Sequence, residues 1–179
     1  MRKEIVKKIE IPKGVKIDID NMKVIIEGGR GKISRMFKGR FIIEKGDNII
    51  ELKVKRATKK DKRLLNSAFS HIKNMIHGVS EGYTYKLKVC FVHFPISLSV
   101  EGKNLIVKNF LGEVKSRRAE ILQGVEMKID KDLVIITSAD KERAGQTAAN
   151  IETATKITKR DRRVFQDGIF IIEKPEREI

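Results

Sequence analysis

An internal repeat at a fixed spacing of 81 residues constrains this chain more than any other feature of its sequence. Aliphatic and polar residues alternate over residues 15–19, and the same alternation returns over residues 96–100. The matched positions are Val15 with Ile96, Ile17 with Leu98, Ile19 with Val100, Ile26 with Val107, Gly31 with Gly112 and Ile33 with Val114. Alternating strands resemble one another in any antiparallel protein, but the shared order and spacing indicate two copies of one unit.

Each copy is expected to contain short strands, then a helix, then a closing strand. Apolar residues recur every three or four positions from Asn66 to His77, which predicts an amphipathic helix, and the second copy has its helix at 143–156. The closing strands are predicted at 83–91 and 169–173. These patterns predict an α+β fold of two tandem copies, each with antiparallel sheet and one main helix around a single core.

Pro95 is expected to mark the junction between the copies, because proline cannot donate to a sheet ladder. The predicted domains are therefore residues 1–94 and 95–179. Residues 1–8 are read as a frayed arm or an extra strand, and residues 174–179 as a free tail.

The charge of the chain favours a polyanionic partner. Lys and Arg number 39 against 24 Asp and Glu, which gives a formal net charge of +15. Residues 1–94 carry 23 basic and 10 acidic side chains, whereas residues 95–179 carry 16 and 14. Because there is no Trp and aromatic residues make up only 6%, a protein that stacks on single-stranded bases is disfavoured.

Other features argue against membrane insertion and for a reducing compartment. No apolar run approaches the roughly 20 residues that span a bilayer, and the opening residues lack the apolar stretch of a signal peptide. Cys90 is the only cysteine, so no internal disulfide can form. We expect a soluble, intracellular protein.

No catalytic constellation is predicted. The GGRGK stretch at 28–32 lacks the spacing of a phosphate loop and reads as a hairpin turn. His71 and His77 lie on nearly opposite sides of the predicted helix, so a metal site that also uses His93 is disfavoured. Cys90 with His93 has no oxyanion-stabilising motif nearby. We therefore expect no enzyme, cofactor, metal or small-molecule substrate.

Clusters of basic residues are the remaining candidates for function. The densest lies at 53–63, where seven basic residues accompany a single acidic one; it includes Lys55, Arg56, Lys59 and Lys60. Residues 156–163 form another cluster, with Lys156, Lys159, Arg160, Arg162 and Arg163. A third contains Lys115, Arg117 and Arg118. Any single cluster could be a solvated loop, but several together suit phosphate contacts with folded RNA.

Five stretches, in order along the chain, resemble the universal large-subunit ribosomal protein L-six family in its eukaryotic and archaeal form, called L-nine in eukaryotic naming. They are IEIPKGVKI from Ile9, VIIEGGRGKISRMF from Val24, SHIKNMIHGVSEGYTYKLKVCFVHFPI from Ser70, KNFLGEVKSRRAEI from Lys108 and KRDRRVFQDGIFIIEK from Lys159. One departure is KRATKKDKRLL from Lys55, where the eukaryotic form has a tryptophan-containing element.

The resemblance implies a structural constituent of the large ribosomal subunit, with two such units per chain. It implies binding to large-subunit rRNA near the factor-binding and sarcin-ricin region, mainly through the second domain, where Lys108 and Asn109 join the basic residues of the matching motifs. Neighbouring ribosomal proteins would be further partners. The expected location is the cytoplasmic ribosome, with nuclear or nucleolar passage during assembly if the source is eukaryotic. The alternative is a basic non-ribosomal scaffold or RNA-associated protein-interaction module.

Overall fold

The computed structural model describes residues 4–175 and 177–178. Contacts divide the chain into two units, Met1–Gly82 and Tyr83–Ile179, which we call unit 1 and unit 2. Each unit has its own hydrophobic core. Within the described part of the chain, no helix is long and apolar enough to cross a membrane.

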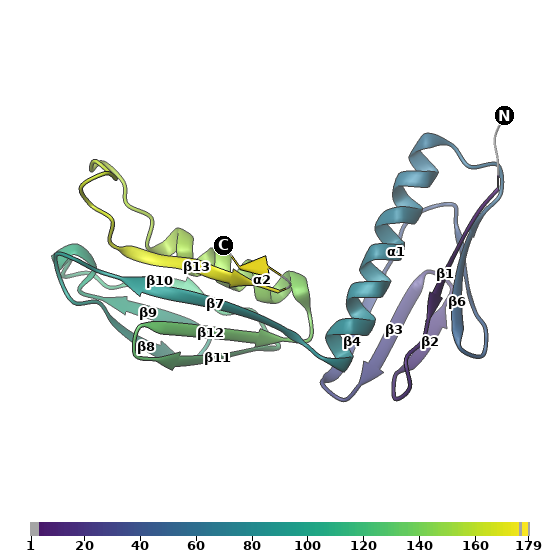
Figure 1. Ribbon diagram of the computed structural model, residues 1–179, viewed down its shortest axis with the longest axis horizontal. Helices are drawn as coiled ribbons and strands as arrows, with labels where there is room; N and C mark the ends of the chain where they lie inside the picture. Colours follow the sequence, from purple (N-terminus) through teal and green to yellow (C-terminus); the bar gives the residue numbers. More distant parts are fainter. Residues whose placement is uncertain (1–3, 176, 179) are drawn as a thin grey trace. The chain divides into compact units, whose positions relative to one another are not determined.

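Unit 1 consists of two three-stranded antiparallel sheets and one long helix (Figure 1). One sheet has the order β1-β6-β5 and the other has the order β2-β3-β4. The elements are β1 (Ile5–Glu10), β2 (Lys16–Asp20), β3 (Lys23–Gly28), β4 (Gly31–Met36), β5 (Ile42–Lys45), β6 (Ile49–Val54) and α1 (Lys59–Ser80). Alternate side chains of the strands, such as Val24 and Ile26 on β3, are fully buried in the core with Ile72 of α1.

Helix α1 begins before the predicted start at Asn66, because Thr58 caps it. The Thr58 hydroxyl accepts from the N–H of Asp61 at 3.2 Å, and the Asp61 carboxylate accepts from the N–H of Thr58 at 3.0 Å. This reciprocal pair is a capping box, and it lowers the pKa of Asp61. The basic segment 53–63 is therefore not irregular, since it ends β6 and forms the first turn of α1.

Unit 2 repeats this arrangement and adds strands. One sheet has the order β10-β9-β8, and the other has five strands in the order β11-β12-β7-β13-β14. The elements are β7 (Tyr83–Cys90), β8 (Ser97–Glu101), β9 (Asn104–Lys108), the short 3-10 turn η1 (Phe110–Gly112), β10 (Arg117–Glu120), β11 (Val125–Asp130), β12 (Leu133–Ser138), α2 (Lys141–Ala154), β13 (Gly168–Lys174) and β14 (Arg177–Glu178).

The two units share a topology, so the predicted duplication and α+β class are confirmed. The order β1-β6-β5 corresponds to β7-β12-β11, the order β2-β3-β4 corresponds to β8-β9-β10, and each set is followed by a helix. The second repeat therefore starts with β7, the strand that we expected to close the first one.

The boundary between the units differs from the predicted one after residue 94. Strand β7 pairs on one side with β12 and on the other with β13, and both are strands of unit 2. Its apolar face, which includes Leu87, packs in the core of unit 2. The division therefore falls between Gly82 and Tyr83. Local alternation predicts a strand but does not show which partners it will have.

The spacing of 81 residues ends within the hairpin formed by β3 and β4 in unit 1 and by β9 and β10 in unit 2. Ile26 pairs with Ile33, whereas Val107, its counterpart in unit 2, pairs with Arg117. Arg117 rather than Val114 is thus the counterpart of Ile33, because three extra residues enter between β9 and β10. Gly31 begins β4 while Gly112 ends η1, so the expected match of these two glycines is wrong.

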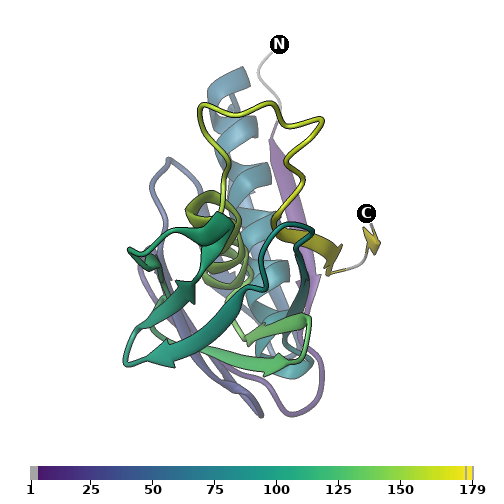
Figure 2. The ribbon, with the colours of Figure 1, turned by 90° about the vertical axis from the view of Figure 1, so that its left-hand side faces the viewer.

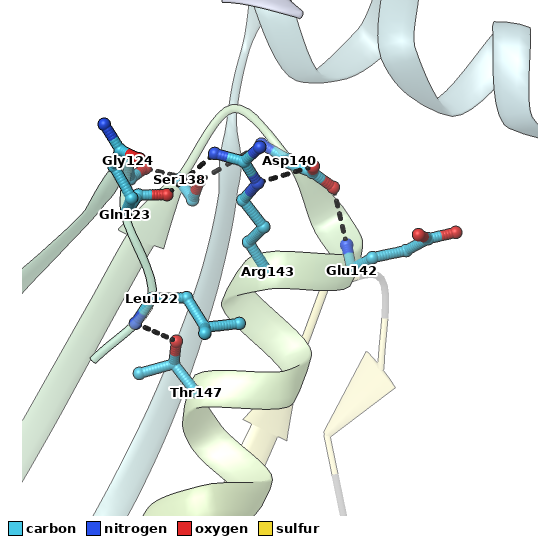
Figure 3. Close-up of polar contacts among 8 residues, drawn as sticks. All are labelled: Leu122, Gln123, Gly124, Ser138, Asp140, Glu142, Arg143 and Thr147. Carbon is cyan, nitrogen blue, oxygen red and sulfur yellow. Dashed lines mark hydrogen bonds and ion pairs between the residues drawn. The ribbon is translucent and has the colours of Figure 1, made fainter. Parts of the chain in front are cut away.

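The start of α2 is anchored to the turn before β11 (Figure 3). The Asp140 carboxylate accepts from the N–H of Glu142 at 2.9 Å and caps the helix. Arg143 donates to the carbonyl of Gln123 at 2.9 Å, and the N–H of Leu122 donates to the fully buried Thr147 hydroxyl at 3.3 Å. These bonds fix α2 over the sheet whose far end carries the candidate site.

The chain ends differ in part from expectation. Ile5 begins β1, so the extra-strand interpretation holds for residues 5–8, while residues 1–3 lie outside the described residues. The predicted free tail contains the two-residue strand β14, whose backbone pairs with the end of β13. Residues 176 and 179 lie outside the described part.

Candidate nucleic-acid interface

Two basic segments of unit 2, residues 108–118 and 156–167, lie side by side because Arg117 joins them. We call them together the basic loop pair. The Arg117 Nη1 atom donates to the carbonyl of Ala154 at 3.0 Å and to that of Lys156 at 3.1 Å. Figure 2 looks toward this end of unit 2, with the loop after α2 in yellow-green. Segments about forty residues apart in the sequence thus form one surface.

Arg117 itself is occupied within the protein. Its Nε and Nη2 atoms donate to the two carboxylate oxygens of Glu113 at 2.9 and 2.6 Å, and its guanidinium lies 4.2 Å from the centre of the Phe110 ring. Hydrogen bonds from Arg117 lower the pKa of Glu113, and the charge of Arg160 contributes. Every guanidinium nitrogen of Arg117 therefore has a partner within the protein, which indicates a structural role. The phosphate contact of Arg117 stays a prediction.

Most other predicted cations of the loop pair are exposed. The side chains of Lys115, Arg118, Lys156, Lys159 and Arg162 make no hydrogen bond or ion pair with any other described residue. Arg160 lies 4.8 Å above the Phe165 ring. Arg163 forms a two-pronged ion pair with Asp161, but its side chain is 90% exposed. These charges remain accessible to an anion.

Lys108 and Asn109 lie where the first segment leaves β9. Lys108 is exposed, with its Nζ atom 4.0 Å from a carboxylate oxygen of Glu101. Asn109 adopts a left-handed conformation with φ of 59°, and its amide donates to the carbonyl of Pro95 at 3.0 Å. This bond shapes the loop, and the RNA contact of Asn109 stays a prediction.

Gly112 meets a conformational requirement in the same segment. Its φ is +75°, which favours glycine, and an added Cβ would lie 3.3 Å from the Phe94 ring. Phe94 belongs to the 91–96 connection that follows β7. The first segment is thus fitted closely against that connection.

Asp167 ties the second segment to the same connection. Its buried carboxylate accepts from the N–H groups of Val92 and His93 at 2.8 and 3.1 Å, and the His93 ring lies 2.6 Å away. The His93 ring also stacks on Phe165. Burial alone raises the pKa of Asp167, but the hydrogen bonds from Val92 and His93 outweigh it and hold the pKa below its ordinary value.

Exposed apolar side chains beside the loop pair were not predicted as part of the site. Val92 is 79% exposed and Val164 is 63% exposed, and Phe91 and Phe94 are also exposed. An open depression of about 1010 Å³ is lined by members of this group together with Lys156 and Arg162. The signal was present in FVHFP at 91–95, where apolar residues leave the alternating pattern of the strand.

The predicted cations of unit 1 form a separate cluster. Lys55 and Arg56 occupy the turn after β6, and Lys59 and Lys60 begin α1; all four are exposed. Two lysines at a helix start oppose the helix dipole, and Asp61 in the first turn offsets this. The arrangement concentrates positive charge at the end of β6 and the start of α1.

The histidines do not assemble a metal site. His77 lies 3.3 Å from Glu81 on the last turn of α1, and His71 is on the same helix, 6.4 Å from the Phe37 ring centre. His93 is in unit 2. Among the described residues, no group of three or more His, Cys, Asp or Glu side chains could hold a metal ion.

Exposed cations gathered on the loops of a duplicated α+β chain suit the phosphates of a folded RNA, which defines a basic, RNA-binding class of protein. The family model described as Ribosomal protein L6 matches residues 11–82 and 94–168. Large ribosomal subunit protein uL6 of Desulfurococcus amylolyticus is 44% identical over 177 residues, covering 96% of each chain. The protein of the same name from Ignicoccus hospitalis is 44% identical, with 91% of each chain covered. That from Methanocella arvoryzae is 44% identical, with 97% of this chain and 99% of the relative covered.

The chain therefore belongs to the ribosomal protein L6 family, which confirms the resemblance noted from its motifs. Proteins of this family are structural constituents of ribosomes rather than enzymes. The two matched stretches correspond to the two repeats but leave out the first strand of each. At the end of unit 2 they also leave out β14 and all of β13 except its first residue, Gly168.

Proposed function

We propose that this chain is a constituent of the large ribosomal subunit that binds large-subunit rRNA through the basic loop pair of unit 2. The observation that carries the proposal is the junction made by Arg117, which assembles two basic segments into one surface. The names of the relatives support the assignment to the large subunit. The ribosome of the cytoplasm is the corresponding location; nuclear passage remains a prediction for a eukaryotic source only.

The chemistry of the loop pair suits RNA phosphates. Lys115, Arg118 and Arg162 are free to approach phosphate oxygens, and an arginine can hold two of them at once. Exposed Val92 and Phe94 beside them offer apolar contact to sugars or bases. From the family resemblance, we place the contact near the factor-binding and sarcin-ricin region.

Two matched variants test which cluster carries specificity. One replaces Lys115, Arg118, Lys159 and Arg162 by Gln, and the other replaces Lys55, Arg56, Lys59 and Lys60 by Gln; each removes four positive charges. Arg117 is left intact in both, so that the fold of the loop pair is kept.

We expect the unit 2 variant to lose preference for an rRNA fragment containing the sarcin-ricin region over random RNA of equal length. The unit 1 variant should weaken binding to both RNAs alike. Each lost phosphate contact should reduce the log–log salt slope by about 0.7 to 0.9. If only the unit 1 variant lost this preference, the specific RNA-binding site would lie in unit 1, and the proposal would be wrong.

The alternative is a basic scaffold outside the ribosome that binds another protein. Sedimentation of the endogenous protein with large subunits at high salt separates the two, because a scaffold of that kind would stay in the supernatant. The unit 1 cluster fits either function, since charge at a helix start attracts polyanions of any sequence.

A further inference from the structure

Strand β1 lies at the edge of its sheet, whereas its counterpart in unit 2, β7, lies inside one. The correspondence follows from the strands that both pair with. β6 and β12 have the same length and the same alternation of half-buried and buried residues. β6 and β12 can be aligned so that Ile49 corresponds to Leu133. Their pairings then make Ile5 of β1 the counterpart of Tyr83 of β7, and Glu10 the counterpart of Lys88.

The hydrogen-bonding groups on the outer edge of β1 can be identified from one bond. The N–H of Ile11 donates to the carbonyl of Asn48 at 2.9 Å, and antiparallel ladders alternate, so residues 5, 7 and 9 face β6. The N–H and C=O groups of Val6, Lys8 and Glu10 therefore point away from β6. Among the described residues, no strand pairs with that edge.

The same alternation in unit 2 shows what such an edge can accept. The N–H of Val89 donates to the carbonyl of Asp132 at 2.7 Å, so the backbone groups of Thr84, Lys86 and Lys88 point away from β12. On that side β13 pairs with β7 as far as Lys86, with a register shift between Ile171 and Glu173. These positions are the counterparts of Val6, Lys8 and Glu10. The duplicated unit thus carries an added strand at the edge that unit 1 leaves open.

The pairing of β13 also indicates the chemistry of an added strand. β13 runs antiparallel to β7, and Glu173 lies opposite Lys86 with an ion pair of 2.7 Å. The counterpart of Lys86 is Lys8, whose side chain is 62% exposed and contacts Glu51. Glu51 also binds Lys53 at 2.6 Å, so it keeps a partner if Lys8 turns to an incoming carboxylate.

We propose that the outer edge of β1 accepts an extended acidic segment of another protein, which adds as an antiparallel strand. This goes beyond rRNA binding and uses a different unit. Charge complementarity supports the acidic partner, because unit 1 carries 21 Lys and Arg against 10 Asp and Glu. Lys7 and Lys8 oppose pairing with the β1 of a second copy, where the lysines of the two strands would meet.

The probe is a synthetic peptide with the β13 sequence from Gly168 to Lys174, flanked by acidic residues, added to the isotope-labelled full chain. Amide hydrogen exchange is measured residue by residue. We expect the amides of Val6, Lys8 and Glu10 to exchange roughly tenfold more slowly with the peptide, while those of Lys7 and Ile9 stay protected throughout.

Two controls separate strand addition from charge attraction. A peptide that is N-methylated at the positions facing β1 keeps every side chain but cannot complete the backbone hydrogen bonds with β1. We expect it to bind at least about tenfold more weakly than the unmethylated peptide. In the protein, Lys8→Pro and Lys8→Ala both remove the lysine side chain, but only Lys8→Pro also removes the backbone N–H, which points away from β6. We expect Lys8→Pro to lose the protection and Lys8→Ala to retain most of it.

Equal binding of the methylated peptide would overturn the proposal, as would protection confined to β7. Protection of Val6 and Lys8 that rises with protein concentration in the absence of peptide would also overturn it, because the occupant would be a second copy. None of these results depends on rRNA affinity, so they are separate from the test of the basic loop pair.

Discussion

At the scale of single residues, Arg117 differs from the charges around it. It was predicted to contact RNA, yet its guanidinium contacts Glu113 and the backbone of residues 154 and 156. Lysine has one nitrogen and cannot span these partners. We expect Arg117→Lys to lower the free energy of unfolding of unit 2 by about 1–3 kcal/mol.

Urea unfolding provides the measurement, and the neighbouring Arg118→Lys is the matched control. Arg118 is exposed on β10, so its change should stay within about 0.5 kcal/mol. If both variants were equally stable, the junction would not hold the loop pair together.

Sequence alone could not have separated the two arginines, because adjacent identical residues differ only in what surrounds them.

Asp167 predicts a pH dependence of stability. Its pKa is lower in the folded protein than the ordinary 3.8, so its contribution is complete above that pH and is lost as the pH falls through the folded value. We therefore expect the urea midpoint of the wild type to fall more steeply below about pH 4 than that of Asp167→Asn.

The control for this comparison is Asp161→Asn. Asp161 also has a lowered pKa, caused by hydrogen bonds from Arg163, but that pair is exposed and screened by solvent. Below about pH 4, the urea midpoint of Asp161→Asn should change with pH almost as that of the wild type does. If the midpoints of the wild type and Asp167→Asn fell in parallel over this pH range, the buried carboxylate would not stabilise the folded state.

At the scale of elements, the capping box predicts how α1 is held at its start. Thr58→Ala removes the oxygen that accepts from the N–H of Asp61, which should cost about 1 kcal/mol. Thr58→Ser keeps the oxygen and should remain near the wild type. Thermal and urea unfolding measure both variants. A neutral Thr58→Ala would mean that the first turn frays and that the helix starts closer to the predicted Asn66.

Strands and helices were predictable where periodicity is local, and their partners were not. Alternation at Ile17 and Ile19 gave β2, and the apolar spacing of Ile72 and Met75 gave the body of α1. The start of α1 was missed because seven cations at 53–63 obscured the spacing of Thr58 and Asp61, which was visible in the sequence. For the candidate site, runs of Lys and Arg predicted the basic clusters. The polar contacts that bring these clusters together join distant segments, so the sequence did not predict them.

At the scale of the whole molecule, the boundary predicts where the chain can be divided. A cut between Gly82 and Tyr83 leaves every sheet intact, whereas a cut after residue 94 removes β7 from between β12 and β13. We expect residues 83–179 to unfold cooperatively as a separate fragment and residues 95–179 to lack a cooperative transition. Circular dichroism with urea titration distinguishes them, and a folded 95–179 fragment would show that β7 is dispensable.

The place of β7 also affects the order of events on the synthesising ribosome. β7 ends at Cys90, but its first partner begins at Leu133 and its second at Gly168. At roughly 5–20 residues per second, the first partner follows several seconds later in slow synthesis, and the second later still. During that interval a nascent strand with alternating apolar residues has both edges open. Unit 1 can already fold by then, so co-translational chaperones would meet this chain chiefly at its middle.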